Sequence, residues 1–161
     1  MSNGKITVKI PIKSHLKKFV LWALDVTAEP IQVTEIDFVG RAIMKVLQET
    51  RAHKFDNVLE DYTDRIEIQL TTRMQERNYR LHRLLHINNE LDKAFREAII
   101  IYVRAQRKAG EPANQACKNF LADLKIDEKE FSYDGAYKAW QRFLESSRKK
   151  KQDRKNSPKS A

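Results

Sequence analysis

Hydrophobic and polar residues alternate strictly in two short segments of the chain, residues 5–10 (KITVKI) and 65–70 (RIEIQL). A period of two is typical of a β-strand with one buried and one solvent-facing side. We therefore expect a strand at each segment, with its isoleucine, valine and leucine residues on the buried side. The polar side chains on the outer sides would be those of Lys5, Thr7, Lys9, Arg65, Glu67 and Gln69.

After the first strand, the apolar residues change to the three-and-four spacing that indicates amphipathic helices. Ser14 is a candidate N-cap for a helix over residues 14–26, which Glu29–Pro30 would follow as a break. Thr34 is the candidate N-cap of a second helix. The alternative for residues 31–33 is a further short strand.

The second expected strand is followed by a similar order of elements. Thr71 and Thr72 are candidate caps of a polar helix, and a break at residues 87–89 precedes a long helix that would end at Gly110. The order strand, helix, helix therefore occurs twice, which predicts an internal repeat. The boundaries we expect are residues 1–53 for the first copy, 54–64 for an acidic link and 65–110 for the second copy.

Residues 111–151 are expected to form a C-terminal helical appendage. Glu111–Pro112 would start one helix, and Ser132 would cap the last. Asp127 and Glu130 have the spacing of a capping box between them. The fold class we expect is mainly α with a short two-stranded antiparallel β-ribbon, built from two β-α-α repeats plus this appendage.

The positive charge of the chain is concentrated at its C-terminal end. The 161 residues include 31 Lys plus Arg and 22 Asp plus Glu, a formal net charge of +9, of which residues 148–159 carry +6. Residues 152–161 show no apolar periodicity, so we expect them to form a disordered basic tail. Such a tail suits contact with a polyanion, and a solubilising end is the alternative.

Composition excludes several classes of protein. One cysteine, Cys117, leaves no internal disulfide and no cysteine-rich zinc site, and four glycines argue against a glycine-rich phosphate loop. No apolar run approaches the ~20 residues needed to span a bilayer, and residues 1–10 lack the order of a secretory signal. We therefore expect no membrane association and a cytoplasmic location.

Catalytic chemistry has little support in the sequence. His82 and His86 lie four residues apart, but Arg83 between them disfavours a divalent cation. No nucleophile has a base at a recognisable spacing. We therefore expect no enzyme, no metal and no cofactor.

The expected element order resembles the ribbon-helix-helix family of DNA-binding proteins. The matching segments are residues 5–10 with the Ser14 and Thr34 helices, and residues 65–70 with the Thr72 and Asn89 helices. The resemblance implies that two fused copies form the strand ribbon that the family usually builds from two chains. It also implies phosphate contacts at the starts of the second helices, Thr34–Glu35 and Asn88–Asn89. Whether the strands pair within one chain or between two stays open, so a homo-oligomer is an alternative.

A two-stranded ribbon fits the major groove of B-form DNA. There Lys9 could approach guanine, Gln69 could bond adenine at two points, Thr7 could touch a thymine methyl, and Glu67 could accept from a cytosine amino group. Phosphate contacts would come from the tail and from Arg142, Arg148, Lys149, Lys150 and Lys151.

The leading hypothesis is therefore a DNA-binding transcriptional regulator or accessory factor, such as prophages and mobile elements carry, with DNA favoured over RNA. The alternative is a helical protein-interaction module, antitoxin-like or a phage assembly factor, with a solubilising basic tail.

Overall fold

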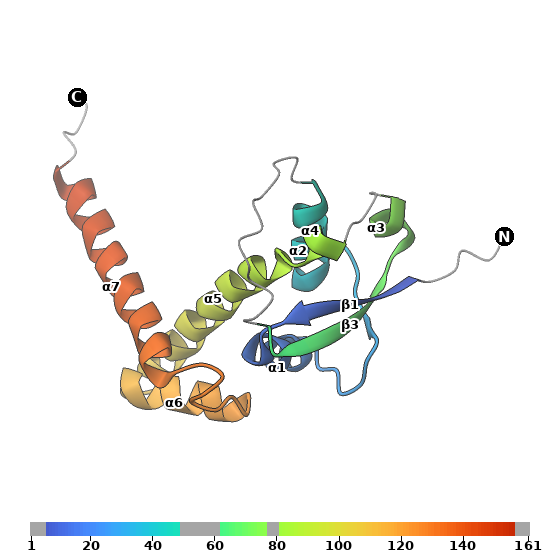
Figure 1. The fold of residues 1–161 in the computed structure, drawn as a ribbon. Coiled ribbons are helices and arrows are strands. Elements are labelled where there is room, and N and C mark those ends of the chain that lie inside the picture. The colour runs from blue at the N-terminus through green and yellow to red at the C-terminus, as the bar shows by residue number, and fades with distance from the viewer. Residues whose placement is uncertain (1–5, 49–61, 77–80, 157–161) are drawn as a thin grey trace. The chain divides into compact units, whose positions relative to one another are not determined.

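The computed structural model describes residues 6–48, 62–76 and 81–156 (Figure 1). The fold is mainly helical and includes a small sheet of three strands, which confirms the expected mostly-α class. Two compact units divide the chain between Phe95 and Arg96, inside the long helix α5 (Ile87–Lys108). Both expected strands therefore belong to the first unit.

The two expected strands pair with each other. β1 (Ile6–Ile12) and β3 (Asp64–Leu70) are antiparallel, with Thr7 opposite Gln69 and Lys9 opposite Glu67 (Figure 1). Pairing is expected physically, because each strand alone would leave a row of backbone donors and acceptors without partners. The inner positions of both strands are buried apart from Ile6 at the start of β1, which is 36% exposed; the buried residues are Val8, Ile10, Ile12, Ile66, Ile68 and Leu70.

A third strand corrects the expected two-stranded ribbon. β2 (Ile31–Gln32) pairs in parallel with β3, so the sheet has the order β1-β3-β2. Ile31 and Val33 are buried and Gln32 is exposed, which is the alternation of a strand. The alternative interpretation of residues 31–33 is therefore correct. Since β2 lies between α1 (Ser14–Ala23) and α2 (Phe38–Gln48), the first half is not a simple strand-helix-helix copy.

The polar helix expected in the second half is described only in part. α3 (Thr72–Glu76) and α4 (Leu81–Leu84) follow β3, and residues 77–80 between them lie outside the described residues. The break expected at residues 87–89 lies two residues earlier, at residues 85–86, because α4 ends at Leu84 and α5 begins at Ile87.

Helices α1 and α2 supply most of the helical side of the first core. The buried residues are Leu16, Phe19 and Val20 in α1, and Val39, Ile43, Val46 and Leu47 in α2. The ring centroid of Phe19 lies 5.5 Å from that of Phe38 and 5.4 Å from that of Phe95. Phe19 therefore joins α1 to the start of α2 and to α5.

The start of α2 differs from the expectation that Thr34 is the N-cap. Asp37 is the capping residue, because its Oδ1 accepts a hydrogen bond from the Gly40 backbone N at 2.7 Å. The Thr34 hydroxyl instead donates to Asp37 Oδ2 at 3.1 Å. A Cβ at Gly40 would lie 1.8 Å from the Thr34 carbonyl oxygen, so this close approach requires glycine.

Ser14 likewise does not cap α1. Lys13 occupies the N-cap position, and the Ser14 hydroxyl shares a hydrogen bond of 2.9 Å with that of Thr63. Lys17 of the same helix lies 3.1 Å from Glu29 and 3.3 Å from Asp64, measured from Nζ to a carboxylate oxygen of each. Burial alone would lower the pKa of Lys17, but the hydrogen bonds to these carboxylates outweigh it and raise the pKa.

Residues 54–61 of the expected acidic link lie outside the described residues, and Asp64 belongs to β3.

Asn88 ties α5 to the end of β1. Its side-chain Nδ2 donates to the Pro11 carbonyl at 3.0 Å and to the Leu85 carbonyl at 3.0 Å. Its Oδ1 accepts from the Lys13 backbone N at 3.3 Å. Asn88 is 3% exposed, so these bonds satisfy a buried amide.

The second unit contains α5 from Arg96, α6 (Ala113–Asp123) and α7 (Tyr133–Asn156). Gly110, at φ 94°, ends the α5 segment as expected. The capping box is also present: the Asp127 backbone N donates to Glu130 Oε2 at 2.9 Å, and the Glu130 N donates to Asp127 Oδ1 at 3.0 Å. The core of this unit is formed by Ile99, Val103, Ala116, Cys117, Phe120, Leu121, Leu124, Ile126, Ala136, Ala139 and Trp140.

The C-terminal end of α7 corrects the expected disordered tail. The helix continues to Asn156, so residues 152–156 are helical. Arginine, lysine and glutamine are good helix formers, and no glycine or proline occurs between Gly135 and Pro158. Cations in the last turn also interact favourably with the helix dipole. Composition alone pointed to disorder because it ignores these local preferences.

Candidate nucleic-acid interface

The outer face of the sheet carries the polar side chains that the alternation predicts. Thr7, Lys9 and Arg65 are exposed, and Glu67 and Gln69 are half-buried. Lys5 lies outside the described residues. The structure therefore brings five of the six expected ribbon residues onto one surface.

Lys9 and Glu67 neutralise each other on this surface. Lys9 Nζ lies 2.8 Å from Glu67 Oε1, and the two residues are direct partners in the strand register. An ion pair between partly exposed groups contributes little to stability, about 0–1 kcal/mol. The ion pair matters more for the charge of this surface. At this position the sheet presents a neutral pair of side chains, whereas the alternation alone predicted an exposed lysine.

Gln32 joins this surface from the third strand. It lies beside Gln69 in the parallel register, and Gln69 lies opposite Thr7 in the antiparallel register. Three uncharged polar side chains therefore form a row across the sheet. The sequence signal for Gln32 is the apolar-polar-apolar order of Ile31, Gln32 and Val33, which is too short to be decisive by itself.

A groove adjoins this row where β2 and β3 end. Its volume is about 290 Å³, and we refer to it as the polar groove. The lining residues mostly end in an amide or a hydroxyl group and include no charged side chain; they are Gln32, Val33, Thr34, Gln69, Leu70, Thr71, Thr72 and Gln75.

The two expected phosphate sites at helix starts have different surroundings from those implied by the resemblance. Thr34 precedes the first turn of α2, where the Asp37 carboxylate already accepts hydrogen bonds from Thr34 and Gly40. That negative charge disfavours a phosphate at the same place. Asn88 is buried against β1, whereas Asn89 is exposed within the first turn of α5.

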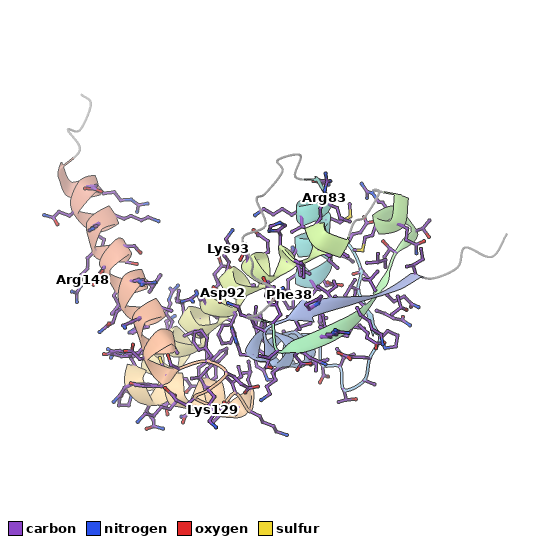
Figure 2. All side chains as sticks on the ribbon, viewed as in Figure 1. Phe38, Arg83, Asp92, Lys93, Lys129 and Arg148 are labelled. Carbon is purple, nitrogen blue, oxygen red and sulfur yellow. The ribbon has the colours of Figure 1, made fainter. Side chains whose placement is uncertain are left out.

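The last turns of α7 form the most basic described surface of the second unit. Arg148, Lys150, Lys151 and Arg154 are all exposed, and we refer to these four as the basic face. Figure 2 shows Arg148 on the part of α7 that continues past α6. Buried α7 residues are confined to the first part of the helix, for example Ala136 and Trp140.

Helical geometry separates the basic face from the acidic residues of α7. Glu145, Lys149 and Asp153 are four residues apart, so they follow one row along the helix. Arg142, three residues before Glu145, lies on the same side. At about 100° per residue, the basic face is centred on the opposite side. The expected phosphate contacts thus form two sets. Arg142 and Lys149 lie in the row of the carboxylates, whereas the basic face is centred away from that row, with only Arg148 and Lys150 three residues from an acid.

In the part of the chain that the structure describes, Cys117 and the metal-ligating side chains form no further candidate site. Cys117 is fully buried, and burial raises the pKa of its thiol to about 11, so it is an unreactive part of the core. Within residues 6–48, 62–76 and 81–156, no group of three or more His, Cys, Asp or Glu side chains could hold a metal ion. The His82 side chain is outside the part that the structure describes.

No family model, curated protein or solved structure matches this chain. Among the described helices, none is both long enough and apolar enough to cross a membrane.

Proposed function

We propose that this chain is a DNA-binding protein, acting as a regulator or accessory factor, and that the basic face of α7 contacts DNA phosphates. The observation that carries the proposal is a set of four exposed cations, Arg148, Lys150, Lys151 and Arg154, centred on the side of the helix opposite the row of Glu145 and Asp153. Contacts between cations and phosphates supply most of the affinity of non-specific DNA binding.

The helical form of this segment favours duplex DNA over RNA. The major groove of B-form DNA admits an α-helix. The major groove of A-form RNA is too deep and narrow for side chains to read. A helix that extends beyond its own core, as α7 does, can lie against a B-form groove without moving the rest of the second unit.

The outer face of the sheet is the proposed source of sequence preference. Gln69 and Thr7 lie there side by side, and their groups can bond or touch base edges. The third strand widens the sheet beside Gln69, so the surface is broader than the two-stranded ribbon that a major groove admits. We therefore propose that the sheet enters the major groove less deeply than a two-stranded ribbon does.

The test compares two double variants of equal charge. Lys150→Gln/Lys151→Gln removes two cations from the basic face, and Arg142→Gln/Lys149→Gln removes two from the row that contains Glu145 and Asp153. Binding to a labelled duplex is measured by fluorescence anisotropy at several salt concentrations. The slope of log affinity against log salt should flatten by about 0.9 for each cation–phosphate interaction that the first variant removes, and less in the second. Equal slopes in both variants and the parent would refute the proposal.

A protein-interaction module is the second candidate. The feature that favours it is a pair of large exposed apolar side chains, one in each unit: Ile36 is 83% exposed and Ile101 is 67% exposed. Under this function, neither pair of charge variants changes DNA binding. Ile101→Ser should instead weaken capture of the partner while leaving the second unit folded.

A further inference from the structure

We propose that the polar groove of the first unit binds one unstacked nucleobase. The inference deepens the proposed function and rests on it, because it names the part of a nucleic acid that this surface takes. The base could come from a single strand or from a free nucleoside, and the experiment below separates the two sources.

The lining of the groove selects for an uncharged polar ligand. None of the lining residues carries a charge. The charged groups nearby in sequence already have partners: Arg73 Nη1 lies 2.7 Å from Glu35 Oε2, and Asp37 accepts from Thr34 and Gly40. A phosphate would therefore gain no cation in the groove, and a metal ion would gain no carboxylate.

Two glutamine amides are positioned to form hydrogen bonds with such a ligand. Gln32 and Gln69 are direct partners in the parallel register, so their side chains lie on the same face about 4.8 Å apart along the hydrogen-bonding direction. Each amide presents a donor and an acceptor side by side. That is the complement of a base edge, as in the two-point pairing of glutamine with adenine.

Two other polar side chains of the groove already form hydrogen bonds within the protein. Gln75 Nε2 donates to the Leu70 carbonyl at 3.1 Å, and the Thr71 hydroxyl accepts from the Met74 backbone N at 3.3 Å. Within the described residues, the structure gives no hydrogen bond to the side chains of Gln32, Gln69 or Thr72. These three side chains are therefore able to form hydrogen bonds with a ligand.

Position and size also favour a single base. The groove lies at the carboxyl ends of two parallel strands, the usual place for a ligand in a parallel sheet. A volume of about 290 Å³ is at the lower limit of small-ligand pockets, which suits one planar ring system more than a whole nucleotide. A base inside a duplex presents only its edge, so a recessed site requires the base to leave the stack.

The experiment follows backbone and side-chain amide signals of the full chain in ¹⁵N-correlated spectra. Adenosine, guanosine, cytidine and thymidine are titrated separately, and a short single-stranded oligonucleotide is titrated in parallel. We expect the side-chain signals of Gln32 and Gln69 and the backbone signals of Thr71 and Thr72 to shift with at least one nucleoside or with the oligonucleotide. Shifts with nucleosides indicate a free-ligand site, and shifts with the oligonucleotide alone indicate a site for single strands.

The variant Gln32→Ala/Gln69→Ala should raise the dissociation constant about tenfold or more, because each two-point amide contact is worth a factor of this order. Gln48→Ala, an exposed glutamine outside the lining, is the matched control and should bind as the parent does. Retained peak dispersion shows that each variant is folded. Absence of groove shifts with every probe, or equal affinity in parent and double variant, would overturn the inference. Lys150→Gln/Lys151→Gln tests the proposed function separately, since it should weaken duplex binding and leave nucleoside shifts in the groove unchanged.

Discussion

The side-chain amide of Asn88 donates a hydrogen bond to the carbonyl oxygen of Pro11 at 3.0 Å, although 77 residues separate the two in sequence. Pro11 itself has no backbone N–H, and a donor two residues further on, the Lys13 N, reaches the same amide. Asn88 therefore takes the place of a strand partner where β1 ends.

Replacing this amide should destabilise the first unit. Asn88→Ala leaves the partly buried Pro11 carbonyl and Lys13 N–H without their partner, so we expect the free energy of unfolding to fall by about 2 kcal/mol. The neighbouring Asn89 is exposed and provides the control. Asn89→Ala should change the free energy of unfolding by less than about 0.5 kcal/mol. Urea denaturation measures both. Equal effects would mean that Asn88 does not hold β1.

Gly40 should tolerate no side chain. The Cβ of alanine would lie 1.8 Å from the Thr34 carbonyl oxygen, so Gly40→Ala must move α2 or the turn before it. We expect a loss of about 3 kcal/mol in the free energy of unfolding. Gly110→Ala meets no atom within 4 Å, but its φ of 94° is strained for alanine, so it should cost about 1 kcal/mol. A smaller loss at Gly40 than at Gly110 in thermal unfolding would contradict the close approach.

Glu90 should make stability depend on acidity. Hydrogen bonds from Lys45 and then Lys93 lower the pKa of Glu90 below its ordinary value of 4.5. Because the folded pKa is lower than the unfolded one, the stabilisation is complete above the unfolded value and is lost as the pH falls through the folded value. Glu90→Gln should cost about 0.5–1 kcal/mol near pH 7 and almost nothing in strong acid.

The control for this pH dependence is Glu97→Gln, an exposed carboxylate on the same helix. Its effect should be near zero at both pH values. If Glu90→Gln cost as much in strong acid as at neutral pH, the loss would come from packing and not from the charge.

Cys117 should react with thiol reagents only after unfolding. The side chain is fully buried, and a pKa of about 11 leaves about a thousandth of it as thiolate at pH 8. Ellman's reagent should therefore label the native protein slowly and label it at once in guanidinium chloride. Gln152→Cys adds an exposed thiol on α7 and should react immediately. Rapid labelling of Cys117 in the native protein would show that its helix opens.

Lys9 and Glu67 should have opposite effects if the sheet contacts DNA. Glu67→Gln removes a negative charge and releases Lys9 from its 2.8 Å ion pair, so duplex affinity should rise. Lys9→Ala leaves Glu67 without its cation, so duplex affinity should fall. Both changes should alter stability by less than about 1 kcal/mol. Unchanged affinity in both variants, measured by anisotropy, would exclude the outer face of the sheet from the DNA contact.

The sequence predicted the parts of the fold that depend on interactions between residues close together in the chain. The alternation of residues 5–10 and 65–70 identified β1 and β3, because a half-buried strand must follow a period of two. The spacing of Asp127 and Glu130 identified a capping box whose two hydrogen bonds involve only neighbouring residues. Both signals are complete within a few residues of sequence.

Features that depend on contacts between residues far apart in the sequence could not be predicted from it. β2 is two residues long, and only its pairing with β3 makes it a strand. Gln32 could therefore not be assigned to the candidate site, because its neighbour Gln69 is far away in sequence. Asn88 had the same difficulty: a polar residue near a helix start suggests a cap or a phosphate contact, and its burial against Pro11 appears only in the structure.

The division between the two units falls inside a continuous helix, between Phe95 and Arg96 of α5. Leu91 and Phe95 are buried on one side of the division, and Ile99 and Val103 on the other. A fragment cut at the division would lose the backbone hydrogen bonds that cross it. A fragment that kept the whole helix would expose apolar residues that belong to the other core. Neither unit is therefore suited to transfer into another protein by itself. A fusion protein that exchanges one unit must also provide side chains that cover the apolar residues of the α5 half belonging to that unit.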